Sequence, residues 1–103
     1  MQKISLTIGH NVGSVSVLDT PTVCSAVTTT LGVSAFTAIP CYGMWQGTAE
    51  SSTRIEIVTD DDDAARIVSQ VGKLAWQLNQ DAIMLEVCSA DVEFTTAAVP
   101  AIA

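Results

Sequence analysis

The stretch from Cys41 to Thr59 constrains the fold most, because it combines a turn signal with the clearest strand pattern in the chain. Gly43 and Gly47 bracket Met-Trp-Gln, and Ser52 to Thr59 then alternates between two kinds of side chain. Alternation with a period of two is typical of a strand with one buried face. We therefore expect a loop or bulge that exposes a large aromatic, followed by a return strand. One face of that strand carries Thr53, Ile55, Ile57 and Thr59, and the other carries Arg54, Glu56 and Val58.

A strand and a helix are expected before this hairpin. Residues 3–8 alternate in the same way, with three aliphatic side chains on one side. Thr20 and Pro21 are typical of a helix start, because Thr20 can accept from a free amide and proline suits the first helical position. Apolar residues at helical spacing then continue to Gly32, a natural helix end.

A second helix is expected after the hairpin, and it follows four consecutive aspartates, Asp60 to Asp63. One aspartate can cap the helix while the others lie in its first turn, where negative charge meets the positive end of the helix dipole. A calcium loop needs spaced ligands and a glycine that this run lacks. We therefore expect capping and no metal site, a helix from Asp62 to about Asn79, and a strand from Ala82 to Ser89.

The predicted order is strand, helix, strand, strand, helix, strand. The strand at 35–41 contains Pro40, which has no backbone N–H to donate and therefore belongs at a sheet edge. Over roughly residues 2–89 this layout resembles the ferredoxin-like plait, an α+β fold with a four-stranded antiparallel sheet and both helices on one face. We expect one domain over 1–95, with a possible short strand at 91–94, and a flexible tail over 96–103. Small acidic plaits of this kind resemble stand-alone phage and bacterial proteins.

Charge and cysteine usage limit the function classes. Eleven acidic residues against four basic ones give a formal net charge of −7, which repels a phosphate backbone and argues against direct nucleic-acid binding. The three cysteines are scattered without a Cys-x-x-Cys pair, as is typical of reduced thiols in the cytoplasm. The start of the chain lacks a signal-peptide pattern, and no apolar run is long enough for a membrane helix. We therefore expect a cytoplasmic protein with no membrane partner.

The candidate binding residues surround the hairpin. A histidine can act as an acid or a base, an arginine matches carboxylate and phosphate groups, and exposed aromatics can stack or anchor a partner. The arginine between two glutamates is expected to balance those two carboxylates, with anion binding as the alternative. The candidate set is His10, Tyr42, Trp45, Glu50, Arg54 and Glu56.

Three functions remain open from these residues. The first is a small non-catalytic binding protein that occupies or inhibits a basic protein partner and forms a homodimer through its half-apolar sheet face or a sheet edge. The second is a protein that binds or sequesters a small anionic molecule or nucleotide, with a pocket around Arg54, His10, Tyr42 and Trp45. The third is an enzyme that uses His10 and Glu50 as acid and base, although no catalytic motif supports it. No cofactor is expected in any of the three.

Overall fold

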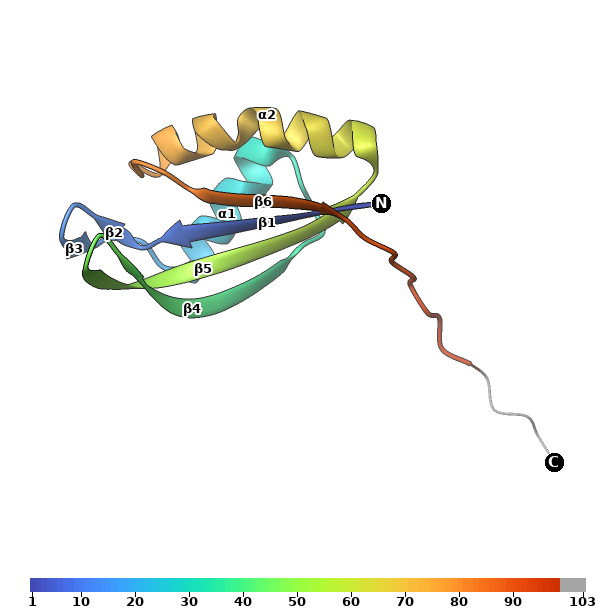
Figure 1. The fold of residues 1–103 in the computed structure, drawn as a ribbon, viewed down its shortest axis with the longest axis horizontal. Coiled ribbons are helices and arrows are strands. Elements are labelled where there is room, and N and C mark those ends of the chain that lie inside the picture. The colour runs from blue at the N-terminus through green and yellow to red at the C-terminus, as the bar shows by residue number, and fades with distance from the viewer. Residues whose placement is uncertain (99–103) are drawn as a thin grey trace.

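The computed structural model describes residues 1–98 as a four-stranded antiparallel sheet with two helices packed on one face (Figure 1). A separate two-stranded hairpin lies beside one end of the sheet. The elements in chain order are β1 (Gln2–Gly9), β2 (Asn11–Val12), β3 (Val15–Ser16), α1 (Thr20–Leu31), β4 (Thr37–Trp45), β5 (Thr48–Thr59), α2 (Asp61–Gln77) and β6 (Met84–Ser89).

The sheet order β4-β5-β1-β6 confirms the ferredoxin-like layout. β1 and β5 are the central pair, with Leu6 opposite Ile55. β4 forms one edge, as the proline at Pro40 requires, and β6 forms the other. The face of the sheet that no helix covers is called the open face below.

The core lies between the helices and the other side of the sheet. Alternate residues of β1 and β5 point into it, and α1 and α2 supply aliphatic side chains at helical spacing. The fully buried large side chains are Ile4, Leu6, Ile8, Val23, Val27, Leu31, Thr53, Ile55, Ile57, Ile67 and Leu74. This arrangement confirms the two faces predicted for the 52–59 strand.

Both helices begin at an aspartate cap. The Asp60 carboxylate accepts from the amide of Asp63 at 2.8 Å, which confirms capping by the aspartate run. At α1 the predicted cap is wrong. Asp19, and not Thr20, accepts from the amide of Thr22 at 2.8 Å. Thr20 is instead already helical, and its hydroxyl bonds to Thr53 on β5.

The central hairpin is longer than predicted. β4 continues to Trp45, and only Gln46 and Gly47 connect it to β5. Both connecting residues have positive φ, at 49° and 80°, as a tight two-residue turn of the primed type requires. Trp45 is therefore the last residue of a strand, and no loop or bulge separates Gly43 from Gly47.

Residues 91–98, after β6, run away from the folded body (Figure 1). Residues 91–98 have no regular secondary structure, so the short strand predicted at 91–94 is wrong. Of the tail predicted over 96–103, residues 99–103 lie outside the described part of the chain. Neither α1 nor α2 is long and apolar enough to cross a membrane.

Candidate functional site on the open sheet face

A network of charged side chains crosses the open face. Arg54 on β5 donates from Nε to Glu56 at 3.0 Å and from Nη1 to Glu86 on β6 at 3.4 Å. Lys3 on β1 lies 3.3 Å from the other oxygen of Glu56. Because β1 separates β5 from β6, the pair between Arg54 and Glu86 spans two strand spacings, about 10 Å at the backbone.

This network covers the polar residues Ser5 and Thr7 of β1. Ser5 lies opposite Glu56 on one side and Glu86 on the other, and only 5% of it is exposed. Thr7 lies between Arg54 and Met84, and its buried hydroxyl oxygen has no hydrogen-bond partner within residues 1–98. A buried hydroxyl without a partner is costly, so its presence on a surface face indicates a place for an added polar group.

The ion pairs fix the charges of the network. The hydrogen bond from Arg54, with further help from Lys3, holds the pKa of the Glu56 carboxyl below its ordinary value. The same hydrogen bond raises the pKa of Arg54 above that of a free guanidinium. Both groups therefore stay charged at neutral pH and offer fixed electrostatic features to a ligand.

Glu50 lies on the same face, toward the turn of the hairpin. Its carboxylate lies over Gly9, where a Cβ would come within 2.6 Å of Glu50 Cδ. The amide of Asn11 donates to Glu50 Oε2 at 3.1 Å. The carbonyl of Asn11 in turn accepts from Gln80 Nε2 at 2.9 Å, which ties this turn to the loop after α2. The carboxylate thus has a cradle made of a glycine and a backbone amide.

His10 lies on the opposite side of the sheet from Glu50. It is only 7% exposed, and its Nε2 lies 2.7 Å from the hydroxyl of Thr53. That hydroxyl lies 2.8 Å from the hydroxyl of Thr20, so the histidine belongs to a polar chain between β5 and α1. The sequence-based pairing of His10 with Glu50 as acid and base is therefore not formed in this geometry.

The two exposed aromatics of β4 do not form one wall. Tyr42 is 74% exposed and Trp45 is 53% exposed, but they stand three residues apart on a strand and so point to opposite faces. Gly43 is directly opposite Glu50, so Trp45, two residues further on, shares the open face with that carboxylate. Tyr42 points to the helix side of the sheet, at a position that the helices do not cover.

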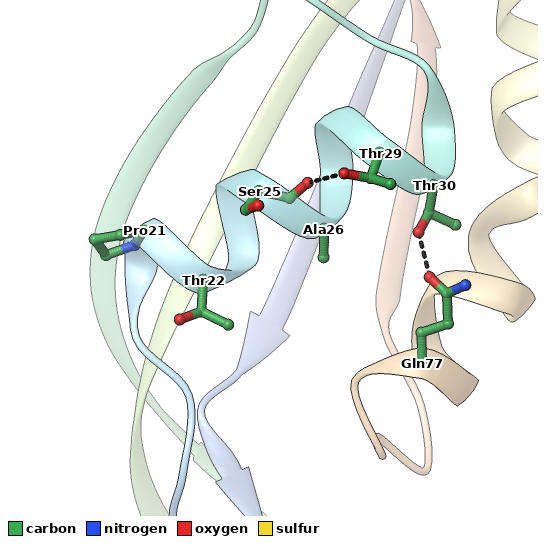
Figure 2. Close-up of a pocket in the computed structure, with 7 residues that line it drawn as sticks. All are labelled: Pro21, Thr22, Ser25, Ala26, Thr29, Thr30 and Gln77. Atoms are coloured by element: carbon green, nitrogen blue, oxygen red, sulfur yellow. Dashed lines mark hydrogen bonds between the residues drawn. The ribbon is translucent and has the colours of Figure 1, made fainter.

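One concave surface of residues 1–98 lies away from this network. A shallow groove of about 560 Å³ separates α1 from the end of α2 and is lined by small and hydroxyl-bearing side chains (Figure 2). Two of its hydroxyls are engaged locally, since Thr29 bonds back to the carbonyl of Ser25 and Thr30 contacts the side-chain amide of Gln77 (Figure 2). This groove contains none of the candidate residues.

The structure thus brings together part of the predicted set. Arg54 and Glu56 are in direct contact, Glu50 and Trp45 occupy the same face nearer the turn, and His10 and Tyr42 lie on the other face. The expectation that Arg54 balances Glu50 is wrong, because its second partner is Glu86. The predicted set lacked Lys3, Thr7, Gly9, Asn11 and Glu86. Alternation along residues 3–8 and 82–89 predicts that Thr7 and Glu86 point away from the aliphatic side chains of their strands, but it gives no strand order that would place them beside Arg54.

Comparison with known proteins identifies enzymes of this fold. No protein-family profile and no curated protein sequence matches the chain. Among solved structures, the chain is similar to a phage SAM lyase in complex with S-methyl-5'-thioadenosine, with a TM-score of 0.61 and 17% identity over 84% of this chain and 79% of that one. It is also similar to a phage SAM lyase in the apo state, with a TM-score of 0.64 and 18% identity over 84% of this chain and 78% of that one.

At this level of identity the likeness shows the fold that the chain shares with these phage proteins. It also corrects one expectation from the sequence. The non-catalytic protein that occupies or inhibits a basic partner is wrong as the leading function, because the structural neighbours are enzymes that act on a small molecule.

Proposed function

We propose that this protein is a lyase that cleaves S-adenosylmethionine (SAM) and releases S-methyl-5'-thioadenosine. The observation that carries the proposal is the similarity of fold, over more than four fifths of the chain, to a phage SAM lyase bound to that thioether. Fold alone does not assign activity, so the proposal depends equally on whether the open face suits the substrate.

The reaction has a simple electron balance. The bond between the sulfonium sulfur and the γ-carbon of the methionyl group breaks, and the sulfur leaves with the electron pair as a neutral thioether. The γ-carbon is satisfied either by the substrate's own carboxylate, which closes a lactone, or by loss of a β-proton, which leaves an alkene. Neither route needs water, a metal or an oxidant.

The charges of the open face complement this substrate. SAM carries a sulfonium, an ammonium and a carboxylate, and so has a net charge of +1 when its adenine is neutral. The open face carries the cations Lys3 and Arg54 and three carboxylates, a net charge of −1. The strongly negative chain also attracts a cation from solution.

We assign the sulfonium group to Glu50. Its carboxylate is held over Gly9 by a backbone amide. On the other side of Glu50 the paired residue is Gly43, where a Cβ would meet nothing, so a bulky group can approach from that side. Trp45 on the same face offers a surface for the adenine, and aromatic stacking of a base contributes about 1–3 kcal/mol. The same carboxylate, fixed by the amide of Asn11, can also act as the base that accepts the β-proton if the alkene is formed.

The test is to incubate the purified chain with SAM and to follow the thioether by chromatography. We expect S-methyl-5'-thioadenosine to appear in amounts that grow with protein concentration and exceed the spontaneous breakdown of SAM. Glu50→Gln keeps the size of the side chain and removes its charge, so we expect kcat/KM to fall about tenfold or more, the range for loss of a charged contact.

Glu93→Gln is the matched control, because Glu93 is an exposed carboxylate after β6 and outside the site. It should turn over SAM like the parent. Absence of the thioether above the spontaneous rate would refute the lyase. Equal activity of the two variants would refute the assignment of Glu50.

A further inference from the structure

We propose that the open face contains a subsite for a zwitterionic α-amino acid group, formed by Arg54, Glu86 and Thr7. This inference rests on the proposed function and deepens it by assigning the methionyl end of the substrate. In this subsite the α-carboxylate binds Arg54 and the hydroxyl of Thr7, while the α-ammonium binds Glu86.

The first argument is the spare hydrogen-bonding capacity at this point. A guanidinium has five N–H donors, and Arg54 uses one toward Glu56 and one toward Glu86. Three donors remain for a carboxylate, which a guanidinium prefers to bind through two parallel bonds. The buried hydroxyl of Thr7, in register with Arg54 and without a partner within residues 1–98, supplies a further donor.

The second argument is that one contact of Arg54 is easily exchanged. Its bond to Glu56 is short at 3.0 Å, whereas its bond to Glu86 is long at 3.4 Å. The Glu86 side chain is also 56% exposed, and ion pairs of this kind contribute little to stability. When a zwitterion binds here, the weak ion pair between Arg54 and Glu86 is replaced by two charge-assisted contacts. The carboxylate of the ligand binds Arg54, and its ammonium binds Glu86.

The third argument is the spacing to Glu50. The Glu50 carboxylate lies over Gly9, and Thr7 is two residues earlier on the same strand face, about 7 Å along β1. The methionyl chain carries its α-carbon three bonds from the sulfur, and the carboxylate reaches one bond further. One extended substrate can therefore place its sulfonium near Glu50 and its amino acid end at Arg54.

The subsite can be tested without turnover by comparing two adenosine thioethers by calorimetry. S-adenosylhomocysteine carries the α-amino acid group but no sulfonium, whereas S-methyl-5'-thioadenosine carries only a methyl group at the same sulfur. For the parent protein we expect S-adenosylhomocysteine to bind about tenfold or more tightly than the methyl thioether, the ratio for gain of a charged hydrogen-bonded contact.

Arg54→Gln should remove most of that preference and leave the affinity for the methyl thioether unchanged. Glu86→Gln should reduce the preference in the same selective way. Lys73→Gln is the matched control, because Lys73 is an exposed cation on α2 and its loss changes the net charge by the same amount. If Arg54→Gln melts at a lower temperature than the parent, Arg54→Lys replaces it. This variant keeps the charge but loses the two-pronged geometry, and so should lose part of the preference.

The outcomes distinguish a failure of the proposed subsite from a failure of the proposed lyase activity. A preference that survives Arg54→Gln, or a variant that weakens both thioethers equally, overturns the subsite. The same holds if the parent shows no preference or binds neither compound. If the preference is present and depends on Arg54 but SAM yields no thioether, the subsite stands and the proposed lyase activity falls.

Discussion

At the scale of single residues, Gly9 has a more specific role than its place at a strand end suggests. The space that any side chain would fill at this position is occupied by the carboxylate of Glu50. The amide of Asn11 holds the same carboxylate from the adjoining turn. Gly9 is therefore a positioning residue, since it lets Glu50 fold down onto the sheet within reach of that amide.

We predict that Gly9→Ala will displace the Glu50 carboxylate and lower kcat/KM for SAM to about the level of Glu50→Gln. The reason is steric, because the added Cβ and the carboxylate cannot occupy the same place. Gly72→Ala is the control, since its Cβ meets nothing within 4 Å and it lies on α2 away from the site. A melting curve shows whether the fold survives. Full activity of Gly9→Ala would contradict a fixed position for Glu50.

The partners of Arg54 show which contacts between single residues could be predicted from the sequence. The alternation of residues 52–59 put Arg54 on the same face as Glu56, and the structure confirms that placement. It did not show that Glu86 replaces Glu50 as the second partner. That choice depends on β1 lying between β5 and β6, a long-range pairing that no local pattern encodes. The contact between Glu50 and Gly9 is equally non-local.

At the scale of elements, periodicity predicted the order of strands and helices, and Pro40 predicted the edge position of β4. Periodicity failed at the hairpin, because residues 48–51 read Thr-Ala-Glu-Ser and lack the apolar alternation that marked 52–59. The strands nevertheless continue to the turn, since cross-strand hydrogen bonds need no buried face. The cap of α1 was misplaced by one residue because Asp19 and Thr20 are both good caps.

The extended hairpin yields a prediction about its tip. We expect Trp45→Ala to leave the melting temperature close to that of the parent, because half of the side chain is exposed at the end of a strand. It should weaken binding of S-methyl-5'-thioadenosine by about 1–3 kcal/mol, the range for loss of a stacked base. Tyr42→Ala is the matched control, an exposed aromatic of the same strand that points to the other face.

Calorimetry on the two variants separates the faces of the hairpin. Equal loss of affinity in both would show that the aromatics act together and that the assignment to the open face is wrong. Unfolding of Trp45→Ala would show a structural role for the side chain. Parental affinity in Trp45→Ala would remove the adenine from this surface.

At the scale of the whole molecule, the helix layer leaves one part of the sheet uncovered. Leu6 and Ile4 of β1 are fully buried, whereas Leu85 and Val87, their partners on β6, are 37% and 48% exposed. The helices therefore cover the central strands and end before this edge. Within residues 1–98 no strand pairs with the outer side of β6, so its backbone groups there can bond to another chain, as at other sheet edges.

We propose that the chain self-associates through this apolar edge and predict that light scattering at high micromolar concentration will give at least twice the mass of one chain. Burial of exposed aliphatic side chains supplies the driving force, at about 25 cal/mol for each Å² removed from water. Val87→Lys should shift the protein toward the monomer, because a lysine there would lose solvent on association. Val15→Lys is the control, since Val15 is equally aliphatic and 61% exposed but lies on the small β2–β3 hairpin. A parent protein that scatters only as a monomer would refute self-association, and an assembly that tolerates Val87→Lys would move the interface away from β6.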